Sequence, residues 1–201
     1  MTAAGLLLAA GAGRRFGHPK ALVELAGEPL VRRALRALTE GGCAPVHVVL
    51  GARAEQVRAL VPAPAATVLA EDWAEGMGAS LRAGLGALAA LPRVPEAALV
   101  HLVDLPGVTA SVVARLAGLS APGVVARAAY DGVPGHPVLL GAHWWPEVVA
   151  GASGDRGARG WLSGRPDLRL VECGDLGSGG DVDTPADLPG HRHCTPPPPV
   201  M

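Results

Sequence analysis

The chain has 201 residues with a formal net charge of −1, and 49% of them are hydrophobic while 17% are charged. These values are typical of a globular protein with a substantial core, and they lack the basic excess with which proteins hold a nucleic acid backbone. The apolar runs are too short to span a membrane and no basic segment precedes the apolar residues near Met1, so we expect a cytoplasmic protein without a membrane partner.

Short runs rich in Leu and Val alternate along the chain with longer amphipathic stretches, a pattern that predicts strands alternating with helices. In chain order we expect a strand at 5–10, a helix at 29–39, a strand at 46–50, a helix at 54–61, a strand at 67–70, a helix at 78–91, a strand at 98–103, a helix at 110–119, strands at 124–128 and 137–140 around a turn at 130–135, helices around 144–149 and 156–163, and a strand at 168–171. This order predicts an α/β fold of three layers, α/β/α, with a mostly parallel, twisted, Rossmann-like sheet.

No linker or internal repeat divides the chain, so we expect a single domain over residues 1–190. Residues 191–201 contain four consecutive prolines and are predicted to form a disordered tail. In parallel sheets ligands bind at the carboxyl ends of the strands. That rule selects three loops: the one after the first strand, the one at Asp104, and the one over residues 71–80.

A glycine-rich segment follows the first predicted strand. It reads Leu8, Ala9, Ala10, Gly11, Ala12, Gly13, Arg14, Arg15, Phe16, Gly17, His18, Pro19 and Lys20. Glycine amides in a tight turn form an anion-binding concavity, and two cations beside it suit a triphosphate. A dinucleotide-binding GxGxxG pattern fails at Phe16, and a P-loop fails because Ala21 follows Lys20. The segment therefore predicts a loop that binds a nucleoside triphosphate.

Lys20 is the only lysine of the chain, which contains 16 arginines and neither Asn nor Ile. This composition indicates a coding bias that replaces Lys by Arg wherever Arg suffices. A lysine that remains in such a chain is a candidate for chemistry that needs a compact ammonium group. Chance survival of this one lysine is the alternative interpretation.

The loop and five further blocks, in this order along the chain, resemble one family. They are the loop, which matches L-A-A-G-x-G-x-R-x-G-x-x-K, then Trp73 to Gly84 (WAEGMGASLRAG), Val103 to Pro106 (VDLP) with Gly135 to Pro137 (GHP), Gly154 to Arg159 (GDRGAR), and Asp181 to Leu188 (DVDTPADL). Over residues 5 to 188 the chain resembles the molybdenum cofactor cytidylyltransferase branch of the GT-A-like nucleotidyltransferase superfamily. Phe16, where the family often has Met, and Glu71, where it often has Asn, are minor departures.

The resemblance implies a magnesium-dependent enzyme that joins a nucleoside monophosphate from a triphosphate, CTP, to a phosphorylated acceptor, molybdopterin, and releases pyrophosphate. It implies a molybdoenzyme or its chaperone as a further partner. Arg15, Lys20 and Asp104 would be catalytic, and Asp104 with Asp183 would hold Mg²⁺, with Asp181 as the second choice for the latter. The implied nucleotide-binding residues are Leu8, Ala9, Ala10, Gly11, Ala12, Gly13, Arg15, Lys20 and Ser80. The implied acceptor-binding residues are Trp73, Met77 and His136.

Structural roles for the same residues stay open. Asp104 could cap a turn, Asp181 or Asp183 could cap a short helix, and Ser80, His136 or Trp73 could serve packing alone. Among functions, the alternatives are transfer to a sugar phosphate, guanylyl transfer to molybdopterin from GTP, and an oxidoreductase that acts on a heteroaromatic compound. The last would need a redox cofactor site, for which the sequence has no fingerprint. A non-catalytic nucleotide-binding regulator would not need the carboxylates.

Overall fold

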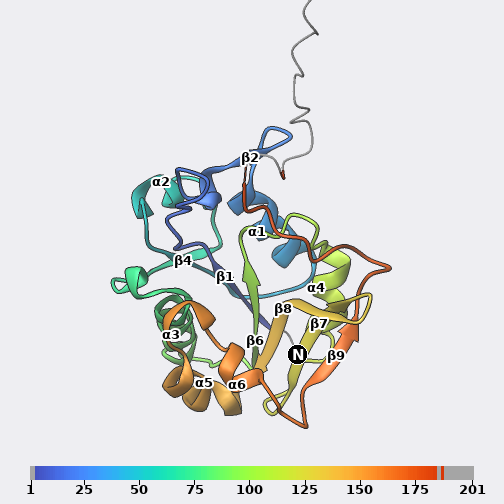
Figure 1. Ribbon diagram of the computed structural model, residues 1–201. Helices are drawn as coiled ribbons and strands as arrows, with labels where there is room; N and C mark the ends of the chain where they lie inside the picture. The colour runs from blue at the N-terminus through green and yellow to red at the C-terminus, as the bar shows by residue number, and fades with distance from the viewer. Residues whose placement is uncertain (1–2, 185–186, 188–201) are drawn as a thin grey trace, which may run out of the picture.

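The computed structural model describes residues 3–184 and residue 187, and the tail predicted over 191–201 lies outside them. Its central sheet has seven strands in the order β5-β4-β1-β6-β8-β7-β9 (Figure 1). The strands are β1 (Ala4–Leu8), β4 (Val46–Leu50), β5 (Ala66–Leu69), β6 (Ala97–Leu102), β7 (Val125–Tyr130), β8 (Val133–Gly141) and β9 (Arg169–Glu172). Only β8 is antiparallel to its neighbours β6 and β7, so the sheet is mostly parallel.

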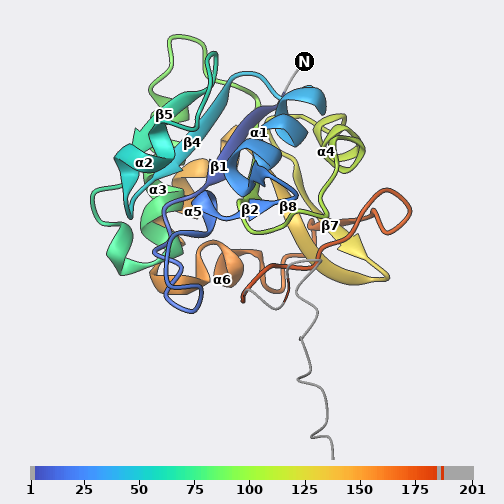
Figure 2. The same ribbon diagram turned by 90° about the horizontal axis from the view of Figure 1, so that it is seen from above.

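Helices cover both faces of this sheet (Figure 2). They are α1 (Leu30–Glu40), α2 (Ala54–Arg58), α3 (Met77–Ala89), α4 (Ala110–Ala117), α5 (Trp145–Gly151) and α6 (Arg159–Leu162). One core lies between the sheet and α1 and α4, and a second lies between the sheet and α3, α5 and α6. The predicted three-layer α/β fold is therefore confirmed. Among the described residues, no helix is long and apolar enough to cross a lipid bilayer.

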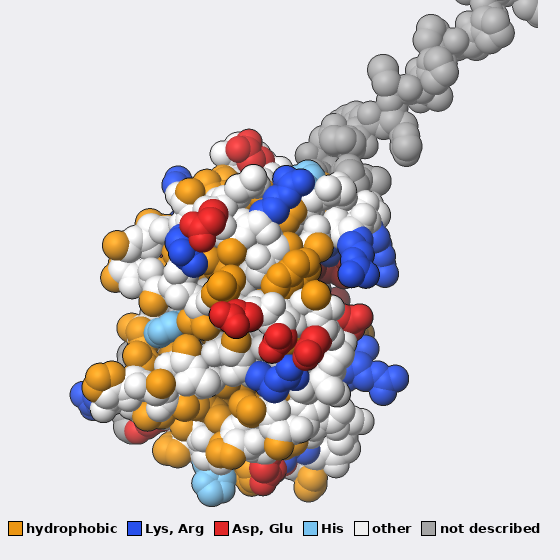
Figure 3. Space-filling model, turned by 90° about the vertical axis from the view of Figure 1, so that its left-hand side faces the viewer, with side chains coloured by type: hydrophobic (Ala, Val, Ile, Leu, Met, Phe, Trp, Pro, Cys, Tyr) orange, Lys and Arg blue, Asp and Glu red, His pale blue; other side chains and the backbone are white. Residues whose placement is uncertain are grey.

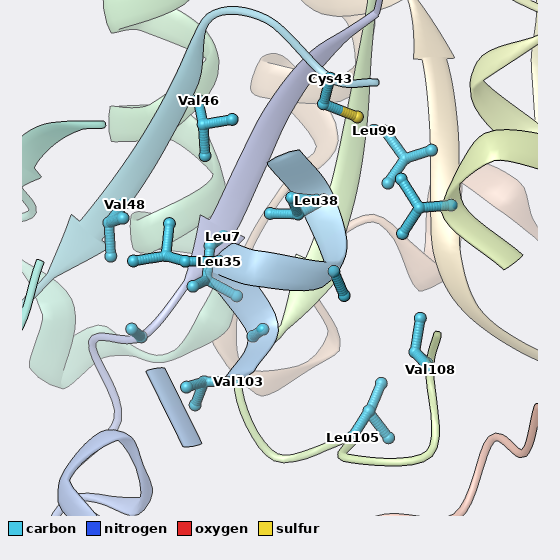
Figure 4. Packing of buried hydrophobic residues seen from close by; sticks show 14 of the residues in the cluster. Leu7, Leu35, Leu38, Cys43, Val46, Val48, Leu99, Val103, Leu105 and Val108 are labelled. Atoms are coloured by element: carbon cyan, nitrogen blue, oxygen red, sulfur yellow. The ribbon is translucent and has the colours of Figure 1, made fainter. Parts of the chain in front are cut away.

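Helix α1 shows how the sequence builds the first core. Apolar side chains recur at helical spacing along it, and Leu35 and Leu38 face Leu7 and Leu99 of the sheet (Figure 4). Burying each leucine contributes roughly 1.5–3 kcal/mol. The helix ends at Gly41, where a Cβ atom would lie 2.3 Å from a methyl carbon of Val113 on α4. The small residue therefore lets the two helices pack on the same face of the sheet.

Most predicted elements occur within three residues of their expected bounds, and the differences have local causes. The turn expected at 130–135 is only Asp131-Gly132, both with positive φ, so β7 and β8 extend almost to each other. This Asp-Gly pair is a strong signal for a two-residue hairpin. A two-stranded hairpin of β2 (Glu24–Leu25) and β3 (Glu28–Pro29) was not predicted, because its strands are too short to show a hydrophobic period.

The surface near α2 and α3 mixes charge types. Figure 3 views the molecule from the side on which these helices lie in Figure 1, and acidic and basic side chains lie near one another there among apolar ones. Several of the basic groups of the chain are neutralised locally, as in the pairs of Arg58 with Glu55 and of Arg82 with Glu75. Exposed pairs of this kind contribute little to stability.

His101 on β6 is fully buried, and among the described residues neither ring nitrogen has a hydrogen-bond partner. Burial, with a smaller contribution from His136, lowers the pKa of His101 to about 3. An unfolded histidine titrates near 6.5, so the unfolded chain binds one proton more than the folded chain between these two values. Folding stability is therefore lost as the pH falls below about 6.5.

Replacing this histidine by leucine tests that effect. His101→Leu should raise the free energy of unfolding at pH 7 by about 1–3 kcal/mol, because two unpaired buried polar atoms are removed. It should also remove about 2 kcal/mol of the loss in stability between pH 7 and pH 5. Urea unfolding at both pH values measures this, with the exposed His143→Leu as the control. If the free energy of unfolding of His101→Leu depended on pH as it does in wild type, His101 would not be the group whose titration lowers the stability.

Candidate active site

The glycine-rich loop leaves β1 at Leu8 and lies at the carboxyl edge of the sheet. Its first residues are fixed to β4 and the loop that follows, because Ala9 donates to the carbonyl of Val49 and Ala52 donates to that of Ala10, each at 3.0 Å. Further along, the N–H groups of Phe16 and Gly17 both donate to the carbonyl of Gly13 at 2.9 Å. Within the described part of the chain, no backbone acceptor takes the N–H groups of residues 11–13. The loop therefore presents amide donors at the sheet edge.

Gly13 is required by the shape of this loop. Its φ is +61°, and a Cβ atom there would lie 2.0 Å from the carbonyl oxygen of His18, which is rigid backbone. Gly13→Ala should therefore distort the loop and lower nucleotide affinity by at least about tenfold, since strain of this kind costs of the order of 1–3 kcal/mol. The rise in Tm with added CTP or GTP measures this. Gly17→Ala, where a Cβ would meet nothing within 4 Å although φ is also positive, is the matched control.

Lys20 joins two carboxylates that are distant in sequence. Its Nζ donates to Oδ2 of Asp104 at 2.7 Å and to Oδ1 of Asp183, while Nη1 of Arg15 donates to Oδ2 of Asp183 at 2.9 Å. Lys20 lies in a 3-10 helix at the end of the loop, and Asp104 follows β6. The N–H of Val182 donates to the carbonyl of Asp104 at 2.9 Å and so holds the C-terminal segment beside it.

The two carboxylates keep Lys20 charged. Burial by itself would lower the pKa of Lys20, but hydrogen bonds from its ammonium to Asp104 and Asp183 and their negative charges raise it overall. The hydrogen bond with Lys20 lowers the pKa of Asp183. Side-chain exposures of 16% for Lys20 and 21% for Asp104 show that these charges are partly withdrawn from water, where they interact more strongly.

Asp104 and Asp183 converge on a single position, which the ammonium group of Lys20 holds. That convergence fits a divalent cation, because Mg²⁺ is commonly held by one or two carboxylates and keeps several waters. Within residues 3–184, no group of three or more His, Cys, Asp or Glu side chains forms a complete protein cage. Asp187 supports the arrangement, since its carboxylate accepts from the N–H groups of Asp183 and Thr184.

A cavity of about 360 Å³ opens beside this cluster and reaches Asp104. Its apolar floor comes from strands β1, β6 and β8 and from α3, and includes Leu8, Val100 and Val138. Met77 and His136, two of the acceptor-binding candidates, line it, as does Asp181. The cavity is therefore placed to hold a second substrate next to the carboxylate pair.

Two other candidates lie elsewhere. Trp73 packs over Gly51. A Cβ atom on Gly51 would lie 2.6 Å from Cγ of Trp73 and 2.7 Å from the carbonyl oxygen of Ala10. Trp73 thus neighbours the glycine-rich loop and not the cavity. Ser80 is 5% exposed near the start of α3 and does not line the cavity, and its role in nucleotide binding stays a prediction.

Two of the sequence blocks form one wall of the cavity. Gly76 has a φ of +114°, and a Cβ on it would lie 2.6 Å from Oδ1 of Asp155, while a Cβ on Gly157 would lie 3.2 Å from the sulfur of Met77. The glycines therefore allow the segment before α3 to contact the Gly154–Arg156 turn closely. Spacing along the chain gives no sign of this contact.

Three arginines of the cavity were not predicted as site residues: Arg127, Arg156 and Arg159. The last two belong to the block Gly154 to Arg159, to which the sequence analysis assigned no role. Arg127 interrupts the otherwise apolar strand β7, and a charged residue in such a strand is a signal that could have indicated it.

This fold, with an amide-rich loop and a carboxylate pair at the carboxyl edge of a mostly parallel sheet, is that of a nucleotidyltransferase. A family model described as MobA-like NTP transferase domain matches residues 5–170, and the chain belongs to that family. The predicted family resemblance and enzyme class are thereby confirmed, while the nucleotide and the acceptor stay predictions.

Relatives within this class carry different descriptions. "Nicotine blue oxidoreductase" of Paenarthrobacter nicotinovorans is 41% identical over 190 residues, 90% of this chain and 91% of that protein. "Probable molybdenum cofactor guanylyltransferase" of Opitutus terrae is 40% identical over 111 residues, 54% of this chain and 50% of the relative. Among solved structures, Rv0371c from Mycobacterium tuberculosis H37Rv has a TM-score of 0.76 at 26% identity, covering 92% of this chain and 94% of its own. A complex of Rv0371c with manganese has a TM-score of 0.71 at 25% identity, covering 86% and 88%.

Proposed function

We propose that this protein transfers a nucleoside monophosphate from a nucleoside triphosphate, CTP, to the phosphate of a small acceptor of the molybdopterin type, and releases pyrophosphate. The observation that carries the proposal is the convergence of Arg15, Lys20 and Asp183 on Asp104, which also lines the cavity. These residues come from three separate segments. A purely structural role would not require both cations and both carboxylates beside free loop amides.

In this proposal the loop amides and Arg15 bind the triphosphate, and Lys20 exchanges its carboxylate partners for the β- and γ-phosphates. Their charges stabilise the pyrophosphate that leaves when an acceptor oxygen attacks the α-phosphorus. No protein nucleophile is needed, because alignment and charge neutralisation supply most of the rate enhancement in such reactions. The cavity holds the acceptor so that its phosphate lies near Asp104.

Asp104 and Asp183 would hold a divalent cation once Lys20 has moved, with Asp181 as the second choice for Asp183. Held by these carboxylates, a cation would supply positive charge to offset that of the phosphates. The manganese complex of Rv0371c supports a divalent metal. Mg²⁺ is the ion we propose, since hard carboxylate oxygens and retained waters suit it.

The experiment mixes purified protein with Mg²⁺, one labelled triphosphate at a time and a molybdopterin-type acceptor, and measures pyrophosphate. We expect turnover with CTP, and a larger rise in Tm with CTP than with GTP. A preference for GTP would replace cytidylyl by guanylyl transfer. No turnover with any triphosphate, together with an unchanged Tm, would overturn the proposal.

A second candidate function is reduction of a heteroaromatic compound, and the full-length similarity to the nicotine blue oxidoreductase favours it. It would need a hydride donor such as a nicotinamide cofactor. Oxidation of NADH or NADPH by the protein with a heteroaromatic pigment tests it. The two functions are separated by Lys20→Met, which should abolish nucleotidyl transfer and leave a hydride transfer largely intact.

A further inference from the structure

The wall of the cavity formed by β7 and the segment before β9 is cationic. Arg127 points into the cavity from β7, and Arg156 and Arg159 line it from the turn and helix beyond α5, with His136 of β8 between. Arg127 pairs with Val138 on β8, which in turn pairs with Val100 on β6. Arg127 therefore lies two strands across the sheet from β6, after which Asp104 follows.

These arginines have no acidic partner among the described residues. Seven others do have one, namely Arg15, Arg33, Arg36, Arg58, Arg82, Arg115 and Arg165. Half-buried Arg127 donates through Nε to the carbonyl of Gly135 at 2.6 Å, and its two terminal nitrogens have no protein acceptor in the described part of the chain. A partly buried charge without a counter-ion is costly to keep.

The positive charges of Arg127 and Arg159 act on each other and on His136. Burial and the charge of Arg159 lower the pKa of Arg127, and burial with the charges of Arg127 and Arg159 lowers the pKa of His136 to about 4. His136 is therefore neutral at pH 7 and can hydrogen-bond a ligand without adding charge. Asp155 and Asp181 line the same cavity, but neither forms an ion pair with these arginines.

We propose that Arg127 and Arg159 bind an anionic group of the acceptor that is distinct from the phosphate that reacts near Asp104. The inference rests on the proposed function, because it specifies the chemical class of the acceptor in that reaction. That class is a small molecule with two anionic groups at opposite ends of a body that packs on the apolar floor of Leu8, Val100 and Val138.

Inorganic phosphate is the probe for this second anion site, and calorimetry on the full chain is the measurement. We expect two phosphate sites, one displaced by CTP or GTP with Mn²⁺ and one that persists. Arg127→Met should weaken the persistent site about 10- to 100-fold, the effect of losing a charge-assisted hydrogen bond, and Arg127→Lys should restore part of it. Arg58→Met, which removes a surface arginine paired only with Glu55, should change neither site.

Equal phosphate affinity in wild type and Arg127→Met would overturn the inference. Arg127 would then serve only to hydrogen-bond the carbonyl of Gly135. A wild type with only the displaceable site would overturn it as well. The proposed function fails separately, since a protein that binds no nucleotide would show phosphate binding insensitive to CTP and GTP. A melt followed by circular dichroism checks that Arg127→Met folds, and Arg159→Met gives a second, exposed position at which to measure the same loss.

Discussion

Lys20→Met should lower nucleotidyl transfer by at least about 10²–10³-fold, because it removes the ammonium group that neutralises the leaving pyrophosphate. The fold should persist, since Lys20 lies at the rim of the sheet and contributes no backbone bond through its side chain. The same change leaves Asp104 and Asp183 facing each other without their shared cation. We therefore expect the free protein to bind Mn²⁺ more tightly than wild type and to gain more Tm from it.

This pair of opposite effects distinguishes the proposed role from a structural one. If Lys20 served only to hold the two carboxylates together, added Mn²⁺ would restore both stability and turnover. Arg14→Met is the matched control, since Arg14 is exposed in the same loop without an ion pair among the described residues, whereas Arg15→Met should lower turnover. Activity that survives in Lys20→Met would contradict the role of its charge.

The sequence predicted the fold well because its signals are local. Leu- and Val-rich runs mark buried strands such as β4, and helix α1 follows from the spacing of Leu30, Ala34 and Leu38. The missed features depend on tertiary contacts. The position of Trp73 over Gly51 is decided by close backbone approach, which no periodicity records.

The candidate site was predicted in part for a similar reason. The resemblance to the family's motifs implied Lys20, Asp104 and Asp183, whose side chains meet across as many as 163 residues of chain. Arg127 and Arg159 were missed because arginine is common in this chain, and because their place in one cavity without a carboxylate partner emerges only from the fold. Such an absence is a property of the folded structure and not of any short sequence.

The carboxylate next to β6 should be the most sensitive residue after Lys20. Asp104→Asn keeps the shape and hydrogen-bonding capacity of the side chain but removes its charge, so we expect turnover to fall by at least about 10²–10³-fold and Mn²⁺ affinity to fall with it. Calorimetry with Mn²⁺ measures the affinity, and a pyrophosphate assay over a series of metal concentrations measures the turnover. Raising the metal concentration should recover part of the rate if binding is the main loss.

Asp183 and Asp181 provide the internal comparison for this prediction. Asp183→Asn should resemble Asp104→Asn, because both carboxylates contact the Lys20 ammonium group. Asp181→Asn should cost at least tenfold less, since Asp181 is exposed at the cavity and makes no contact with Lys20 among the described hydrogen bonds. A larger loss of turnover in Asp181→Asn than in Asp183→Asn would identify Asp181 as the second metal ligand. If Asp104→Asn retained wild-type turnover and Mn²⁺ affinity, Asp104 would be a partner of Lys20 in the free protein alone, and the metal would have to lie elsewhere.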